Sequence, residues 1–283
     1  MSSISKISIV TPSFNQGSFI EEALHSVRDQ AHLLLEHIVI DGASTDTTIS
    51  ILKKYSEQPE WKHLKWISEP DSGQTEALNK GFRMATGEII GWLNADDRYR
   101  PGCFEAVVDA FGSRPDIDIF YGDYTYMDEN GRVYRIRREI EFSRFILRHY
   151  YPLYIPTAST FFRRRIFDAG NWLNVNYDYV MDYEFFLRLS QKSYHFQHIP
   201  ELLADFRWHP ASKSSSPAGP SKQREEGEQA ARMYSPILRR VPQGLPLILV
   251  RASVRALAAS LRYSEKLLRG YYFEQFRDPK TNA

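Results

Sequence analysis

Two adjacent carboxylates, Asp96 and Asp97, follow directly on the apolar run that ends at Leu93 and form the strongest chemical signal in the sequence. Neighbouring carboxylates repel each other unless a cation or hydrogen-bond donors compensate their charge. Oxygen ligands of this kind suit Mg²⁺ or Mn²⁺, which can in turn bridge a diphosphate. A turn or a helix cap explains the same pair without a metal, so both interpretations stand at this point.

Two further carboxylates stand at the ends of predicted elements. Asp41 follows a β-branched run and opens the stretch Asp-Gly-Ala-Ser-Thr-Asp, in which Ser44 or Thr45 can cap the next helix. Capping does not account for Asp41, whose carboxylate could accept a hydrogen bond from a nucleobase imide. Asp182 lies at the start of a predicted helix, where it is either a helix cap or a general base.

His209 ends a predicted strand and precedes a loop rich in serine and proline. A lone histidine is more often structural than functional. At this place, however, a neutral imidazole could complete a metal site.

The elements that must position these residues alternate between short β-branched runs and helical patterns. Strands are predicted over 7–10, 37–40, 64–67 and 88–93, and helices over 19–30, 47–55 and 75–84. This alternation favours an α/β fold with a mostly parallel, Rossmann-like sheet flanked by helices. Because ligands bind beyond the carboxyl ends of strands in such sheets, the loops after the first, second and fourth strands should converge on one crevice.

After about residue 100 the pattern becomes mixed. Helices are predicted over 101–111 and 182–189, and strands over 117–127, 132–136 and 160–162. The stretch 210–221 (PASKSSSPAGPS) is predicted to be a flexible loop.

Composition excludes several classes of protein. The 283 residues include 36 basic and 35 acidic side chains, a balance that argues against a nucleic-acid partner. The single cysteine, Cys103, cannot form an intramolecular disulfide and favours a reducing cytosol. No apolar stretch reaches the roughly 20 residues that span a bilayer. We therefore expect a cytoplasmic protein without a transmembrane helix.

The near-neutral total is the sum of two unlike parts. Residues 1–235 carry a net charge of −5, whereas residues 236–270 carry +6. On a helix over 247–270, the cations fall within an arc of roughly 60° and the apolar side chains within an adjacent arc of roughly 80°. The two sets are Arg251, Arg255, Arg262, Lys266 and Arg269, and Leu247, Val250, Val254, Leu257, Leu261 and Leu268.

This pattern is typical of an interfacial membrane helix. It predicts peripheral contact through residues 247–273 with the inner face of the cell membrane. The alternative is that the apolar stripe packs on the rest of the protein and the arginine face is solvated.

The order and spacing of the motifs resemble those of inverting nucleotide-sugar glycosyltransferases of family 2, which have the GT-A fold. The matching stretches are 9–15 (IVTPSFN), 39–47 (VIDGASTDT), 69–81 (EPDSGQTEALNKG), 85–97 (ATGEIIGWLNADD), 181–189 (MDYEFFLRL) and 206–212 (FRWHPAS). The resemblance implies a GT-A catalytic domain over 1–215. Residues 216–283 lie outside it and are expected to form a basic, amphipathic helical extension.

The resemblance also implies roles for individual residues. Asp41 matches the base-reading aspartate and Asp182 the general base. Asn94 stands where the family has the first acid of its Asp-x-Asp motif, which leaves open which of the two acids ligates the metal. The residues expected to bind the nucleotide sugar are Thr11, Pro12, Ser13, Asn15, Asp41, Asp71, Gln74, Asn79, Asn94, Ala95 and Asp96. Those expected to hold Mn²⁺ or Mg²⁺ are Asp96, Asp97 and His209.

The resemblance implies transfer of a sugar from a nucleoside-diphosphate sugar to a hydroxyl of a glycan or lipid-linked acceptor, with inversion, in cell-surface polysaccharide or glycolipid assembly. Such transfer needs one base for the acceptor and one cation for the leaving diphosphate. A non-catalytic nucleotide- or sugar-binding protein on the same fold is an alternative, although it would not require Asp182 and His209. A nucleotidyltransferase is another, but residues 11–17 lack the lysine or arginine expected of its phosphate loop.

Overall fold

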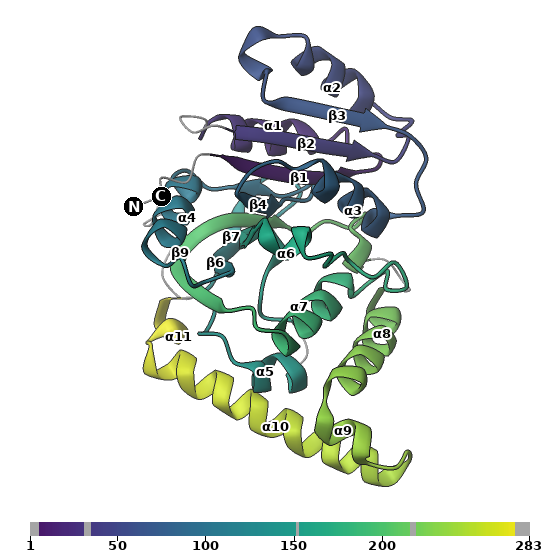
Figure 1. The fold of residues 1–283 in the computed structure, drawn as a ribbon, viewed down its shortest axis with the longest axis vertical. Helices are drawn as coiled ribbons and strands as arrows, with labels where there is room; N and C mark the ends of the chain where they lie inside the picture. Colours follow the sequence, from purple (N-terminus) through teal and green to yellow (C-terminus); the bar gives the residue numbers. More distant parts are fainter. Residues whose placement is uncertain (1–5, 31–34, 151–152, 216–218, 275–283) are drawn as a thin grey trace.

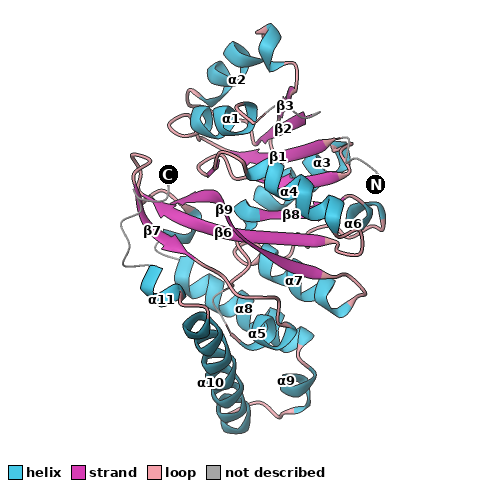
Figure 2. Ribbon diagram, turned by 90° about the vertical axis from the view of Figure 1, so that its left-hand side faces the viewer, coloured by secondary structure: helices cyan, strands magenta, loops and turns pink. Residues whose placement is uncertain are grey.

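The computed structural model describes residues 6–30, 35–150, 153–215 and 219–274. Within them, nine strands form one sheet in the order β3-β2-β1-β4-β8-β6-β9-β5, with β7 paired to β6, and helices lie against the sheet (Figures 1 and 2). The strands are β1 Ile7–Ser13, β2 Leu35–Asp41, β3 Leu64–Ser68, β4 Ile89–Trp92, β5 Arg98–Tyr99, β6 Ile119–Met127, β7 Val133–Arg137, β8 Thr160–Arg163 and β9 Phe196–Arg207. The α-helices are α1 Ile20–Arg28, α2 Thr48–Ser56, α3 Gln74–Met84, α4 Cys103–Ser113, α5 Arg144–His149, α6 Arg165–Asp168, α7 Met181–Gln191, α8 Gly219–Tyr234, α9 Pro236–Arg240, α10 Leu245–Leu268 and α11 Tyr271–Glu274.

The first half of the sheet is parallel, as predicted. β1 pairs with β2 on one side and with β4 on the other, and β2 pairs with β3. The chain therefore moves outward through β2 and β3 and then crosses back over β1, so the strand order reverses between β1 and β4. Crevices that bind ligands form at such a reversal, outside the carboxyl ends of the strands.

Both faces of this half are covered, which explains its continuous apolar runs. Val10 of β1 packs with Phe82 of α3 in one core, whereas Ile9 packs with Phe104 of α4 in the core on the opposite face. Every residue of β1 is buried. The strand ends beneath the crevice are thus held by cores on both sides.

The second half of the sheet is mixed. β8 lies antiparallel between β4 and β6, and β9 runs parallel to β6 and antiparallel to β5. β9 therefore ends at the same edge of the sheet as β1 and β4 and delivers Arg207 there. The predicted fold class, α/β with flanking helices, is confirmed.

The predicted elements agree with the observed ones to within three residues at each end. The stretch 210–221 is the exception. A short 3₁₀ helix covers Lys213–Ser215 and α8 begins at Gly219, while residues 216–218 lie outside the described ranges. The last part of this stretch forms the first turn of α8, a helix that packs on α7 and whose last residue, Tyr234, donates a hydrogen bond to Glu184. The domain boundary between residues 215 and 216 stays a prediction.

Helix α10 confirms the helical prediction for the C-terminal segment and shows which of its sides faces the protein. Arg262 and Lys266 are buried against the carboxylate of Glu139, and Arg251 Nη1 lies 2.9 Å from Glu228 Oε2. The alternative considered for this segment, an apolar stripe packed inward with a solvated arginine face, is therefore wrong at Arg262 and Lys266, because the buried Glu139 needs cationic partners. No helix of the described ranges is both long and apolar enough to cross a membrane.

Candidate active site

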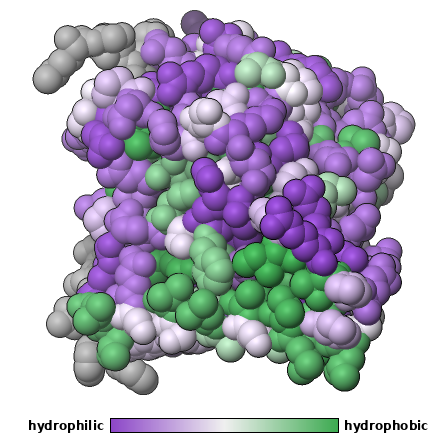
Figure 3. Space-filling view, turned by 60° about the horizontal axis from the view of Figure 1, so that its bottom comes forward, coloured by the Kyte–Doolittle hydropathy of each residue, from purple (hydrophilic) through white to green (hydrophobic). Residues whose placement is uncertain are grey.

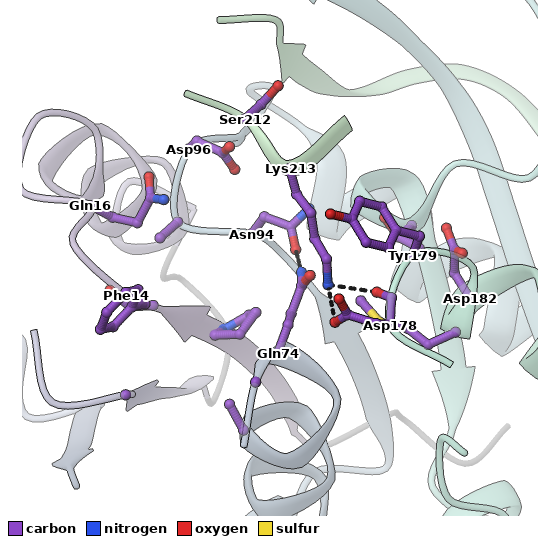
Figure 4. A pocket seen from close by; sticks show the side chains of 18 of the residues that line it. Phe14, Gln16, Gln74, Asn94, Asp96, Asp178, Tyr179, Asp182, Ser212 and Lys213 are labelled. Carbon is purple, nitrogen blue, oxygen red and sulfur yellow. Dashed lines mark hydrogen bonds and ion pairs between the residues drawn. The ribbon is translucent and has the colours of Figure 1, made fainter. Parts of the chain in front are cut away.

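A cavity of about 590 Å³ opens at the carboxyl ends of β1 and β4 (Figure 4). The loops that follow β1, β2 and β4 all contribute to its wall, as the sequence pattern predicts. The predicted site residues that line the cavity are Pro12, Ser13, Asp71, Gln74, Asn94, Ala95, Asp96 and Asp182.

The side-chain amide of Asn94 is engaged at both ends. Its Oδ1 accepts hydrogen bonds from Gln74 Nε2 and Trp92 Nε1, each at 2.9 Å, and its Nδ2 donates to Asp97 Oδ2 at 3.2 Å. A carboxylate in the same position would place two acids in contact without a donor between them. The hydrogen bonds of its amide therefore explain why asparagine, and not aspartate, suits position 94.

The carboxylate of Asp97 bonds to protein groups and does not line the cavity. Its Oδ1 accepts a hydrogen bond from the Arg207 backbone N–H at 2.8 Å, and the side chain is buried. Burial, together with the charge of Asp96, raises the pKa of Asp97 well above its usual range. Since Asp97 has protein partners for both oxygens, Asp96 is the acid of the pair that faces the cavity.

Arg207, which the sequence analysis did not single out, holds the turn that carries both acids. Its buried guanidinium donates from Nε to the Asp96 backbone oxygen at 2.8 Å and from Nη2 to Glu22 Oε2 at 2.6 Å. The side chain also lies over the ring of Phe19. An arginine at the end of a strand carries no distinctive sequence signal, because its partners come from segments far away in the chain.

Asp96 and His209 come together beside the cavity although 113 positions separate them. His209 Nε2 lies 3.1 Å from Asp96 Oδ2; the histidine is buried, with its ring tilted at 48° to that of Phe19, whereas the carboxylate is partly exposed. No cluster of three or more histidine, cysteine or acidic side chains suited to a metal occurs in the part of the chain that the structure describes. A carboxylate and an imidazole nevertheless suit a cation whose other ligands are phosphate oxygens and water.

The loop after β2 is organised around Asp41. This buried carboxylate accepts hydrogen bonds from the Ser44 backbone N–H at 2.9 Å, the Ser44 hydroxyl at 2.5 Å and the Ser68 hydroxyl at 2.8 Å. Asn15, whose φ of 51° is left-handed, joins this loop to β1 by accepting from the Thr45 backbone N–H at 2.9 Å. Asp41 and Asn15 therefore shape the wall next to Gly42, which lines the cavity itself.

Gly42 allows Asp71 to approach the β2 loop. A Cβ atom at residue 42 would lie 2.9 Å from Asp71 Oδ2. Asp71 Oδ1 accepts from the Gly73 backbone N–H at 2.9 Å, and burial raises the pKa of the Asp71 carboxyl. The close contact keeps this acid at the cavity wall.

Six predicted site residues are absent from the cavity lining, and two of these, Thr11 and Asn79, have partners elsewhere in the fold. The hydroxyl of Thr11 is 2.9 Å from His37 Nε2 inside the sheet. Both ends of the Asn79 side-chain amide bond to the backbone of Leu173, at 2.8 and 2.9 Å. Thr11 and Asn79 therefore support the fold beneath the site, because neither side chain reaches the cavity lining.

Asp182 lines the cavity from the start of α7, across from Asp96 (Figure 4). One oxygen accepts a hydrogen bond from the Tyr183 backbone N–H at 2.8 Å. Burial nevertheless dominates and raises the pKa of Asp182 to about 6. A carboxyl group with a pKa in this range can accept a proton and release it again near neutral pH.

A second group of lining residues was missed by sequence reasoning. Lys213 Nζ lies 2.6 Å from Asp178 Oδ1 and also bonds to the Asp178 backbone oxygen, with the ring of Tyr179 alongside (Figure 4). Glu226 of α8 fixes the same segment by accepting backbone N–H groups of residues 178–180 at 2.8–3.3 Å. Lys213 falls in the stretch that the sequence predicts to be a flexible loop. It was therefore not predicted as a site residue, although it lines the cavity.

The sequence of this chain is similar to those of known glycosyltransferases. The family model described as glycosyl transferase family 2 matches residues 8–170. TuaG of Bacillus subtilis, which is described as a "putative teichuronic acid biosynthesis glycosyltransferase", is 34% identical over 125 residues; the match covers 44% of this chain and 49% of TuaG. The chain thus spans about half the length of this relative.

Two solved structures share the architecture. TarS of S. aureus in complex with UDP-GlcNAc has a TM-score of 0.65 at 18% identity, covering 92% of this chain and 73% of that one. A mannosyltransferase of Pyrobaculum calidifontis in complex with GDP-Man and Mn²⁺ has a TM-score of 0.56 at 18% identity, covering 89% and 80% of the two chains. At this level of identity the similarity is one of fold.

Proposed function

Because this chain belongs to glycosyl transferase family 2, we propose that it transfers a sugar from a nucleoside-diphosphate sugar to an acceptor hydroxyl, with inversion of the anomeric centre. The observation that carries the proposal is the pair of unlike groups across one cavity: Asp96 with His209 on one side and Asp182 on the other. The description of TuaG supports a role in cell-surface polysaccharide or glycolipid assembly.

Asp182 is the proposed general base. The acceptor hydroxyl gives its proton to the Asp182 carboxylate while its oxygen forms a bond to the anomeric carbon. On the opposite side of that carbon, the bond to the diphosphate oxygen breaks and the nucleoside diphosphate leaves. Attack and departure on opposite faces invert the configuration.

Asp96 and His209 are the residues that would hold Mn²⁺ or Mg²⁺. Bound there, the ion supplies positive charge for the departing diphosphate. The loop that ends in Asp97 orients Asp96. Arg207 donates a hydrogen bond to the Asp96 backbone oxygen, and Asn94 donates one to the carboxylate of the neighbouring Asp97. The bound Mn²⁺ of the Pyrobaculum calidifontis enzyme supports the choice of cation.

The proposal extends to location. The buried thiol of Cys103 is consistent with a reducing compartment, and a nucleotide sugar would be met on the cytoplasmic side. We infer peripheral contact with the membrane through α10, which would bring the protein to lipid-linked acceptors.

One experiment tests the nucleotide and the metal together. Thermal-shift measurements with UDP and GDP, with and without Mn²⁺, should show one diphosphate raising the melting temperature, and Mn²⁺ should enlarge that shift. Equal shifts in EDTA would contradict the metal assignment. Binding of the diphosphate without its release from any donor and acceptor would favour a non-catalytic binding protein.

Replacing Asp182 by asparagine separates binding from chemistry. Asp182→Asn keeps the shape of the side chain but removes the proton acceptor, so transfer should fall by about 10²–10⁴-fold. The thermal shift produced by the nucleoside diphosphate should stay as in the unmodified protein. Normal turnover by this variant would exclude Asp182 as the base.

A further inference from the structure

The outward side of α10 carries no charged residue and is rich in exposed apolar side chains, with the exposed Ser253, Ser260 and Ser264 among them. Seven of its apolar side chains are between 48 and 88% exposed: Leu245, Ile248, Leu249, Leu257, Leu261, Leu267 and Leu268. Apart from Ile248, they fall within an arc of roughly 160° that contains no charged residue of the helix. Figure 3, in which the end of the molecule that carries α9 and α10 comes forward, shows a hydrophobic patch on that face. Exposed apolar patches of this kind mark interaction surfaces.

The orientation of α10 is set by its other side. Arg251 pairs with Glu228 at 2.9 Å, Arg269 with Glu141 at 3.3 Å, and Lys266 with Glu139 at 3.3 Å. Turning the apolar side inward would break these pairs and expose Glu139, which is fully buried. The apolar side therefore faces outward as a fixed feature of the fold.

A cationic cavity lies next to this apolar side. It has a volume of about 280 Å³ between β7 and α10 and is lined by Arg135, Arg137, Arg262 and Lys266, with tyrosines at its wall. Three of these cations contact the single carboxylate of Glu139: Arg262 Nη2 at 2.5 Å, Lys266 Nζ at 3.3 Å and Arg137 Nη2 at 3.9 Å. The surplus of positive charge suits an anion.

The titration of Lys266 agrees with this geometry. Burial, and after it the neighbouring Arg262 and Arg137, lower the pKa of Lys266 to about 8, although Glu139 opposes the shift. A bound anion would restore the charge balance around the lysine.

Tyr263 joins the two features. Its ring is 48% exposed on the outward side of α10, it lines the cationic cavity, and its hydroxyl lies 3.1 Å from that of Tyr150. Tyrosine suits a boundary between apolar and polar surroundings because one end of the side chain is apolar and the other is polar. The apolar surface and the cavity are therefore continuous at this residue.

We propose that the cavity between β7 and α10 binds the phosphate of an anionic phospholipid, while the outward side of α10 lies among the acyl chains of the same leaflet. The inference rests on the membrane contact proposed above and names its ligand. A phospholipid matches both parts, since it carries an anion beside an apolar chain. A second copy of the protein would instead bring an equally cationic cavity to the same surface.

Vesicle flotation with the full-length chain tests this proposal. The protein should float with vesicles of phosphatidylcholine containing phosphatidylglycerol, and much less with phosphatidylcholine alone. Leu249→Gln combined with Leu267→Gln should weaken flotation about tenfold or more, whereas Val175→Gln, at an exposed apolar residue elsewhere, should not. Glutamine keeps the helix because its helix propensity is close to that of leucine.

The cavity has its own variants. Arg135→Gln and Arg137→Gln should each lower flotation with anionic vesicles about threefold or more, and Lys53→Gln, at an exposed position of α2, serves as the matched loss of charge. Equal flotation with both kinds of vesicle, or equal losses from Arg135→Gln and Lys53→Gln, would overturn the phosphate site. A rise in melting temperature with inorganic phosphate but no flotation would identify a free anion as the ligand and overturn the lipid.

Two further readouts isolate this inference. A dimer in analytical ultracentrifugation that Leu249→Gln with Leu267→Gln abolishes, without flotation of the unmodified chain, would assign the surface to a second copy and overturn the proposal. Nucleoside diphosphate binding is measured on the same preparations without vesicles. Normal nucleotide binding with no flotation contradicts only the lipid site, whereas flotation without nucleotide binding contradicts only the proposed transferase function.

Discussion

Asp182 combines two opposing influences on one carboxyl group. Its place at the start of α7 and its bond from the Tyr183 N–H favour the ionised form, but burial outweighs them and raises the pKa to about 6. The group is therefore ionised at neutral pH yet basic enough to take a proton from an acceptor hydroxyl.

The pH dependence of transfer follows from this pKa. Because only the ionised carboxylate accepts a proton, and because the pKa is raised to about 6, transfer should fall as pH drops through about 6. Initial rates between pH 5 and 8 at saturating donor measure this limb. A rate that stays constant down to pH 4.5 would mean that another group takes the proton.

At the scale of elements, α8 supports the site from outside the sheet. The carboxylate of Glu226 accepts backbone N–H groups from residues 178–180, directly before α7 and Asp182. The loop that presents Asp178 and Tyr179 to the cavity therefore depends on a helix that follows it by some forty residues.

Glu226→Gln tests that dependence. Loss of the charged acceptor should cost about 1–2 kcal/mol of unfolding free energy and lower the melting temperature by a few degrees. The KM for the acceptor should rise more than the dissociation constant for the nucleotide. Glu225→Gln, at an exposed neighbour, is the control and should change neither quantity.

Sequence periodicity predicted the elements of the first half because their signals are local. β1, β2 and β4 are β-branched runs bounded by turn residues, and the helices between them are amphipathic. The place of Arg207 and Lys213 in the site depends instead on contacts across the chain, to Glu22 and Asp178. Periodicity alone does not contain such contacts.

The same limit applies to the faces of α10. The sequence predicted an apolar and a cationic side, but the side that packs inward depends on where Glu139 and Glu228 lie in the folded chain. Only the tertiary structure supplies that information.

At the scale of the whole molecule, the two oppositely charged parts of the chain are held together by ion pairs. Residues 1–235 carry a net charge of −5 and residues 236–270 a net charge of +6. The two parts contact each other where Arg262 and Lys266 pair with Glu139 and where Arg269 pairs with Glu141. The near-neutral total thus reflects an internal pairing of surfaces.

Glu139→Gln should show how much this pairing contributes. Removing the buried carboxylate leaves three neighbouring cations without their common partner, which should cost about 3–5 kcal/mol. Glu141 is half exposed, so Glu141→Gln should cost only about 0–1 kcal/mol. Urea unfolding of both variants measures the difference, and equal losses would contradict the central role of Glu139.

The amide of Asn94 has a consequence for protein engineering. Consensus substitutions commonly stabilise a protein. Restoring the Asp-x-Asp motif that the resemblance to the family implies would be such a substitution, Asn94→Asp. That change would set a carboxylate against Asp97 where a donor now stands 3.2 Å away, while Asp96 adds its charge nearby. Differential scanning calorimetry should therefore show a lower melting temperature for the variant than for the natural sequence. Restoring the family motif at this position would destabilise the protein.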